Sequence, residues 1–302
     1  MTVRVPAKVN LQLGVGPLRD DGYHDLVNVF HAVSLFDEVT AVPADAPRVT
    51  VEAAPDAQVA IEDVPVDADN LALRAARLLA GRLGVEPNVE LRIRKAIPVA
   101  GGMAGGSADA AAALLACARL WNAEPALAGL PELAAEIGSD VPFALLGDTA
   151  IGLGRGERLT PVETSGTFHW VFALADGGLS TPAVYAECDR LRAASGEPVP
   201  WPPPTDELMK ALAAGDARAL GAALTNDLQP AALTLRPSLR RTLDAGRELG
   251  AIGALVSGSG PTTAFLAGSA DHAADLAAAL ARAGVARQVV CAHGPVPGAT
   301  VV

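Results

Sequence analysis

The chain has 302 residues, half of them apolar and 19% charged, and its formal net charge is −11. This much apolar material can bury a core, which excludes a mostly disordered chain, and the acidic balance argues against non-specific binding to nucleic acid. The length suits one large domain or two modest ones. A local basic pocket for a phosphate ligand is compatible with this composition.

The N-terminal segment and the cysteines indicate in which cellular compartment the protein is expected. Charged residues occupy the N-terminal segment where a signal peptide needs an apolar run, and no stretch of about 18 uncharged apolar residues follows, so we expect no membrane span. The three cysteines are far apart and form no C-x-x-C pair, and the five histidines lack the spacing of a zinc site. We therefore expect a cytoplasmic protein without a disulfide framework.

The first half of the chain mixes strand and helix patterns. Alternating apolar residues predict strands, and a change to helical spacing after Asn70 predicts a helix that Asn70 can cap. Strands are expected over 3–15, 26–42, 48–53, 59–61, 88–94 and within 149–162, a turn over 17–22, and helices over 70–83, 107–121 and 131–138. Because the strands cluster early among helices, this half favours an α+β fold.

The second half begins with an apolar run that predicts a strand over 168–175. The prolines of 198–204 exclude regular structure there. Helices are expected over 206–214, 216–224, 237–249 and 270–283, and strands over 252–256, 262–267 and 286–292. We expect a domain boundary near 150–165.

A glycine-rich turn at 101–106 leads straight into a helix and is the strongest local signal. Glycine lets backbone N–H groups approach an anion, and a helix N-terminus adds unpaired N–H groups and about half a positive charge. Ser107 stands where a Walker A motif needs lysine, and no G-x-G-x-x-G fits this junction. The pattern predicts a polyphosphate site of another type, with a glycine-rich connection of no function as the alternative.

Lys8 and Asp140 are candidates for acid–base chemistry. Lys8 lies in an expected strand, where a half-buried ammonium is costly without a partner. A carboxylate such as Asp140 can accept the proton of a substrate hydroxyl, and an ammonium can orient that group and offset phosphate charge. Taken singly, each residue also suits an ordinary role, as an exposed edge lysine and as a turn or cap aspartate.

Three segments together resemble the GHMP kinase superfamily, named for galactokinase, homoserine kinase, mevalonate kinase and phosphomevalonate kinase. Residues 6–11 (P-A-K-V-N-L) resemble its N-terminal motif, 98–111 its P-x-x-x-G-L-x-x-S-x-A-like loop, and 257–261 (S-G-S-G-P) its late glycine-rich motif. The motifs are specific as an ordered set, and the resemblance is nearly continuous over 3–160 and then thins until 252–267.

Within the superfamily, four features most resemble the kinases of 4-diphosphocytidyl-2-C-methyl-D-erythritol. They are D-G-Y-H at 21–24, D-N-L at 69–71, G-S-D-V-P at 138–142 and G-L-G-R-G-E at 152–157. The resemblance implies ATP-dependent phosphorylation of the 2-hydroxyl of that substrate, a step of the non-mevalonate route to isoprenoid precursors. It also implies two domains, an ATP-binding domain at 1–158 with the S5-domain-2-like fold and a substrate-binding domain at 159–302 with the ferredoxin-like fold.

The resemblance implies a role for each matching residue. Asp140 would be the general base, and Lys8 would orient the hydroxyl and help to neutralise the transferred phosphoryl group. The ATP phosphates would be held by Gly101, Gly102, Gly105, Gly106 and Ser107. Asn70 and Lys95 would lie near the nucleotide.

The substrate residues follow in the same way. Asn10 would contact the substrate end nearer the chemistry, and Tyr23 and His24 would hold the cytosine end. Tyr185 would stack on the other face, with Thr181 at the same pocket. A pyrimidine needs a flat stacking surface and an edge partner, and these residue types supply both.

The loop departs from the family's frequent Gly-Gly-Ser-Ser-Asn at two positions. Ala108 removes a hydroxyl, and Asp109 brings a carboxylate that either points away, caps the helix or meets the metal. Mg²⁺ is expected because ATP phosphates need charge neutralisation, but its ligands are left unassigned.

Three alternatives stay open. Another kinase of the superfamily would act on homoserine or mevalonate, but those substrates carry no base for Tyr23, His24 and Tyr185 to hold. An inactive relative would only bind a ligand, and a Rossmann-type oxidoreductase would need a third glycine where Arg19 stands. For the preferred kinase we expect only small-molecule partners and a monomer or weak homodimer.

Overall fold

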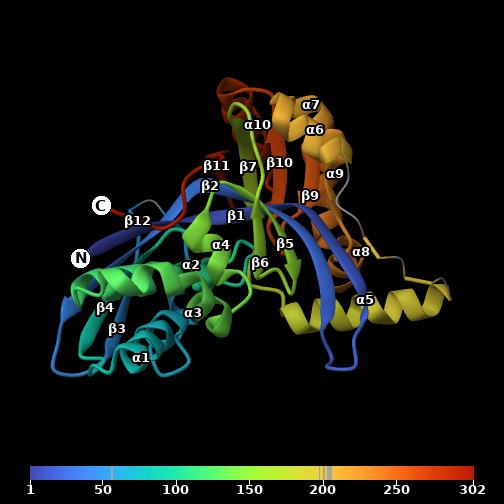
Figure 1. Cartoon of the computed structure of the whole chain (residues 1–302). Helices are drawn as coiled ribbons and strands as arrows, with labels where there is room; N and C mark the ends of the chain where they lie inside the picture. Colours follow the sequence, from blue (N-terminus) through green and yellow to red (C-terminus); the bar gives the residue numbers. More distant parts are fainter. Residues whose placement is uncertain (56, 197, 200, 203–205) are drawn as a thin grey trace.

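Two β-sheets organise the chain in the computed structural model, which describes residues 1–55, 57–196, 198–199, 201–202 and 206–302 (Figure 1). The larger sheet has the strand order β12-β1-β2-β4-β3; β5 pairs with β2, β6 pairs with β5, and the short β8 is parallel to β1. Its strands are β1 (Thr2–Leu18), β2 (His24–Pro43), β3 (Arg48–Ala53), β4 (Val89–Lys95), β5 (Thr149–Gly154), β6 (Arg158–Pro161), β8 (Thr225–Asn226) and β12 (Thr300–Val301).

The long strand β2 has two partners on one edge. Its residues 26–31 pair with β5 and its residues 38–43 pair with β4, while β1 follows its other edge. The hairpin between β1 and β2 consequently extends beyond the body of the sheet and reaches helix α5 (Thr181–Ser195) of the other half (Figure 1). This hairpin carries two of the predicted substrate residues to α5.

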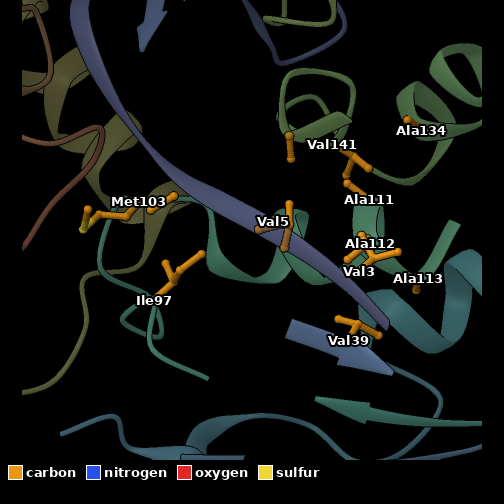
Figure 2. Close-up of a cluster of buried hydrophobic side chains, with 14 of the residues drawn as sticks. Val3, Val5, Val39, Ile97, Met103, Ala111, Ala112, Ala113, Ala134 and Val141 are labelled. Carbon is orange, nitrogen blue, oxygen red and sulfur yellow. The ribbon is translucent and has the colours of Figure 1, made fainter. Parts of the chain in front are cut away.

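Helix α2 (Gly105–Leu120) is the centre of the first core. It packs on β1 and β2, and α1 (Leu71–Leu83) packs against it, as do α3 (Leu130–Ile137) and α4 (Val141–Leu146). Figure 2 shows Val3 and Val5 of β1 beside the alanines at 111–113 of α2, all of them buried. Such small side chains bring the helix close to the sheet, so the glycine-rich loop before it is firmly placed.

The second sheet has four strands in the order β11-β7-β10-β9, all antiparallel. They are β7 (Phe168–Leu174), β9 (Gly253–Val256), β10 (Thr263–Ala267) and β11 (Gln288–Gly294). Numbered along the chain, that order is 4-1-3-2, with helices between the first and second strands and between the third and fourth. This is the split βαβ arrangement of ferredoxin-like folds, as expected.

The remaining helices belong to this second half. They are α6 (Asp206–Ala214), α7 (Ala217–Ala223), α8 (Gln229–Leu235), α9 (Ser238–Glu248) and α10 (Ala270–Ala283). The strands β8 and β12 come from this half of the chain but join the first sheet. The exact division at 158/159 stays a prediction.

Most predicted elements are confirmed within one to three residues, and the differences have local causes. The predicted strand at 59–61 is wrong, since these residues lead into a single 3-10 turn at Ile61–Asp63. Helices α4, α5 and α8 were not predicted, and each has a proline in its first turn, where proline is tolerated but resembles a breaker in the sequence. The predicted irregular segment 198–204 lies partly outside the described residues. None of the helices in the described part of the chain is long and apolar enough to cross a membrane.

Candidate active site

Two glycine-rich loops, one from each half of the chain, touch at the centre of the molecule. The Ser257 hydroxyl donates to the carbonyl oxygen of Gly102 at 3.1 Å, and the backbone N–H of Thr262 donates to that of Gly101 at 3.4 Å. A Cβ on Gly102, whose φ is +76°, would lie 2.0 Å from the Ser257 carbonyl oxygen. Only glycine permits this approach, which joins the two halves at the site.

The first loop ends at an open helix N-terminus. The residue before α2 is Ala104, which has a φ of 61° and no side chain able to cap the helix. Gly106 is exposed and Ser107 is half-buried, so the first N–H groups of α2 face outward beside a serine hydroxyl. Unpaired N–H groups and the helix dipole at this end attract an anion such as a phosphate.

Lys8 lies directly beside this loop. Its ammonium is buried and donates to Asn10 Oδ1 at 2.6 Å and to the Gly102 carbonyl oxygen at 3.2 Å. Burial lowers the pKa of Lys8, and the nearby carboxylate of Asp140 opposes that shift. A buried ammonium with these neighbours is suited to meet a further anion or hydroxyl.

Asp140 lies close to Lys8, which the sequence alone could not show. Its Oδ2 lies 3.7 Å from Lys8 Nζ, and its side chain is 29% exposed. Asp140 occupies the N-cap position of α4 but makes no side-chain capping hydrogen bond. The carboxylate is therefore partly exposed and not used as a cap, with the ammonium of Lys8 close by.

Lys95 lies beneath the loop in a buried ionic cluster, which we call the Asp37–Lys95–Asp109 cluster. Its ammonium donates to the carboxylates of Asp37 and Asp109, and Asp37 also accepts from the backbone N–H groups of Ala96 and Ile97 at 2.6 and 2.9 Å. Burial alone would lower the pKa of Lys95, but the two carboxylates outweigh it and raise that pKa. Burial raises the pKa of Asp109, with the charge of Asp37 adding to the shift and Lys95 opposing it.

The cluster shows the orientation of the Asp109 carboxylate, which the sequence left open. Its carboxylate faces inward to Lys95, away from the open end of α2, and a Cβ on Gly105 would lie 3.2 Å from Lys95 Nζ. An interior position of β2, the end of β4 and the N-terminal part of α2 are thus held together under the loop. Contact between Lys95 and a nucleotide stays a prediction.

Asn70 caps helix α1, as expected. Its Oδ1 accepts from the N–H groups of Ala72 and Leu73 at 3.0 and 3.2 Å, and its amide donates to the Pro65 carbonyl oxygen. The next residue, Leu71, would contact a Cβ placed on Gly106 at 3.4 Å. Asn70 therefore lies one residue from the phosphate loop, and a role toward a nucleotide stays a prediction.

An aromatic group lies where the β1–β2 hairpin meets α5. The rings of His24 and Tyr185 stack with centroids 5.5 Å apart and planes 26° apart. His24 Nδ1 bonds to the Gly16 carbonyl oxygen at 2.9 Å, and Nε2 lies 3.3 Å from Asp189 Oδ2. These partners fix the imidazole edge, and burial raises the pKa of Tyr185, so its hydroxyl stays neutral.

Tyr23 stands apart from that stack. Its ring is 54% exposed, and the guanidinium of Arg155 lies over it at 5.4 Å from the centroid. Thr181 at the start of α5 bonds to the hydroxyl of Ser259 at 2.9 Å. The predicted substrate residues thus come from three separate segments: β1 with Asn10, the β1–β2 hairpin with Tyr23 and His24, and α5 with Thr181 and Tyr185.

The comparisons with known proteins decide the family. The model for the GHMP kinases N terminal domain matches residues 70–148, and that for the GHMP kinases C terminal domain matches residues 208–286. A 4-diphosphocytidyl-2-C-methyl-D-erythritol kinase of Thermobifida fusca is 63% identical, with 100% of this chain and 98% of that protein covered. The chain belongs to the GHMP kinase family.

Solved structures agree with this assignment. A crystal structure of 4-(cytidine 5'-diphospho)-2C-methyl-D-erythritol kinase has a TM-score of 0.76 and 33% identity, covering 97% of this chain and 98% of that one. A homoserine kinase from Cytophaga hutchinsonii has a TM-score of 0.72 at 18% identity, covering 100% and 97%, and shows the shared fold alone. This GHMP kinase is thus an ATP-using enzyme with the expected α+β architecture.

Several residues of the kinase site were missed by the sequence analysis. Asp37 contacts Lys95, Asn28 contacts Asn10 and Asp189 contacts His24, across 58, 18 and 165 positions of sequence respectively. No local motif marks these partners. By contrast, the glycine-rich segment at 257–261, which supplies Ser257, was marked in the sequence.

Proposed function

We propose that this kinase transfers the γ-phosphoryl group of ATP to the 2-hydroxyl of 4-diphosphocytidyl-2-C-methyl-D-erythritol, in the non-mevalonate route to isoprenoid precursors. The observation that carries the proposal is the Lys8–Asp140 pair, 3.7 Å apart beside the open N-terminus of α2. The full-length identity to a kinase named for this substrate supports the choice of acceptor.

The residues suggest a direct in-line transfer. Asp140 accepts the hydroxyl proton as the oxygen attacks the γ-phosphorus, and ADP leaves from the side of the glycine-rich loop. Lys8 orients the hydroxyl and offsets the charge of the phosphoryl group, while Gly101, Gly102, Gly105, Gly106 and Ser107 hold the ATP phosphates. Positioning and electrostatics carry such a transfer without a covalent enzyme intermediate.

Mg²⁺ suits the donors present here. Among the described residues no cluster of three or more histidine, cysteine or carboxylate side chains forms a metal cage. Mg²⁺ is commonly held by phosphates, water and one or two protein oxygens, and the Ser107 hydroxyl beside the open end of α2 is an oxygen of that kind. With ATP bound, the ion would neutralise phosphate charge.

The cytosine end of the substrate would lie at the β1–β2 hairpin. Tyr23, His24 and Tyr185 offer aromatic faces to a cytosine, and the His24 ring is held in place through both of its nitrogens, by the Gly16 carbonyl oxygen and by Asp189. Thr181 lines the same region. Asn10, whose amide is already bonded to Lys8, would contact the substrate end near the chemistry.

The test is ADP release from purified protein with ATP and Mg²⁺, comparing the cytidyl substrate with homoserine and mevalonate. Turnover is expected with the cytidyl substrate alone, and Asp140→Asn should lower kcat by about 100-fold or more. Asp148→Asn is the matched control, because Asp148 is an exposed aspartate at a φ of 51°, which asparagine tolerates. Turnover with homoserine or mevalonate would refute the assignment of the substrate. Full activity of Asp140→Asn would refute the role of Asp140 as general base.

A further inference from the structure

A chain of polar groups runs from Lys8 into the interior of the first sheet. Lys8 donates to Asn10 Oδ1 at 2.6 Å, and Asn10 Nδ2 donates to Asn28 Oδ1 at 3.2 Å. Asn10 is 1% exposed and Asn28 is 3% exposed. Asn28 lies on β2 and is absent from every motif that marks the site in the sequence.

The direction of this chain is set by chemistry. An ammonium only donates hydrogen bonds, so Asn10 must turn its carbonyl oxygen toward Lys8 and its NH₂ group away. That NH₂ group then needs an acceptor in a buried place, and Asn28 Oδ1 is the acceptor. Without it, the Asn10 NH₂ group has no acceptor in this buried place, and only the bond to Lys8 holds the amide.

We propose that Asn28 is a positioning residue, which fixes the Asn10 amide and thereby holds the Lys8 ammonium in place for phosphoryl transfer. The proposal rests on the proposed function for the role of Lys8, but the hydrogen-bond chain itself does not depend on the substrate. Among the described residues, no hydrogen bond joins the Asn28 side chain to Lys8 or to the phosphate loop, so its route to Lys8 is through Asn10.

The ammonium has few other fixed partners, which makes the Asn10 bond important. Besides Asn10, Lys8 Nζ bonds to the Gly102 carbonyl oxygen at 3.2 Å and lies 3.7 Å from Asp140 and 5.8 Å from the Phe30 ring centroid. Asp140 is the charged group that faces Lys8 in the described part of the chain, and Tyr185 on α5 interacts with Asp140 in turn. The Asn10 bond is the shortest of these contacts.

The experiment follows the Lys8 ammonium directly by NMR. The chain has three lysines, Lys8, Lys95 and Lys210, so protein labelled with ¹³C-lysine gives three side-chain signals to titrate. Asn28→Leu removes the acceptor at similar volume. Because a hydrogen bond to the charged form stabilises it, the Lys8 signal should titrate about half a pH unit or more lower in this variant.

Two further variants separate positioning from a general loss of stability. Thr149→Val also breaks a buried hydrogen bond in this sheet, to His31 at 2.9 Å, and should leave the Lys8 titration unchanged. Asn28→Asp keeps the acceptor oxygen and should titrate at or above the wild-type pH. If Asn28→Leu does not fold, Asn28→Ser, which keeps a shorter acceptor, should give a smaller shift in the same direction.

We expect Asn28→Leu to change kcat but not KM for ATP. Asn28→Leu should lower kcat by about tenfold while KM for ATP stays within about twofold, since the phosphate loop is untouched. An unchanged Lys8 titration in Asn28→Leu, or an equal shift in Thr149→Val, would overturn the inference. A wild-type protein with no turnover of the cytidyl substrate would overturn the proposed function instead, because the NMR result does not use that substrate.

Discussion

Replacing Lys95 by methionine tests the Asp37–Lys95–Asp109 cluster most directly. The variant keeps most of the length of the side chain but removes the ammonium that lies between the two carboxylates. Lys95 is 1% exposed, Asp37 0% and Asp109 4%, so solvent cannot replace the lost partner. Removing one partner of a buried ion pair typically costs about 3–5 kcal/mol, which is a large part of a total stability of about 5–15 kcal/mol.

The loss should depend on pH in a defined direction. The pKa of Asp109 lies above its usual 3.8, and it rises further when the opposing charge of Lys95 is removed. The folded variant then binds more protons than the unfolded chain above about pH 4, so its stability falls as pH rises through this window. The deficit of Lys95→Met relative to wild type should be smaller at pH 5 than at pH 8.

Urea unfolding followed by circular dichroism at both pH values measures this deficit. Lys210→Met, at an exposed lysine, is the matched control and should stay within about 0.5 kcal/mol of wild type. Asp109→Asn keeps an acceptor for Lys95 and should cost less than Lys95→Met. A deficit below about 1 kcal/mol at pH 8, or one that does not change with pH, would refute the view that this cluster is a buried ion pair holding the loop.

Three further predictions concern the loop, the cap and Lys8. Gly102→Ala places a Cβ against the Ser257 carbonyl oxygen and should raise KM for ATP by about tenfold or more, measured by steady-state kinetics beside Gly166→Ala, an open glycine of similar φ. Asn70→Ala removes the α1 cap and should lower the free energy of unfolding by about 0.5–2 kcal/mol in urea titrations, whereas no loss would contradict the capping role. Because burial lowers the pKa of Lys8 and transfer needs its charged form, kcat should decline with rising pH starting below pH 10.5, and a flat profile to that pH would contradict the role of Lys8.

The sequence reveals local structure well because local patterns determine it. The helix over 270–283 was predicted to the residue, since a serine cap, helical spacing and a closing glycine all lie within its own segment. The glycine-rich turn before α2 was found for the same reason. Helix α5 was missed because it buries only Val184, Glu187 and Cys188, so its sequence lacks a clear apolar face.

The site itself depends on contacts that no local pattern records. Lys8 meets Asp140, and Asp37 meets Lys95, only after strands and helices far apart in sequence pack together. Resemblance to a family supplied Lys8 and Asp140 as a pair before the structure showed their distance. It could not supply Asn28, because a partner that acts through another side chain leaves no motif of its own.

The glycines of the phosphate loop have two roles, which are phosphate binding and close packing against the rest of the protein. From the sequence alone, all four glycines are expected to bind phosphate, because glycine exposes backbone N–H groups. In the structure, two of them also face other parts of the protein. A Cβ on Gly102 would clash with the Ser257 carbonyl oxygen, and a Cβ on Gly105 would crowd the ammonium of Lys95. Gly106 is exposed and has only the edge of Leu71 nearby. Substitution at Gly106 should therefore weaken ATP binding while sparing stability, whereas substitution at Gly102 should affect both.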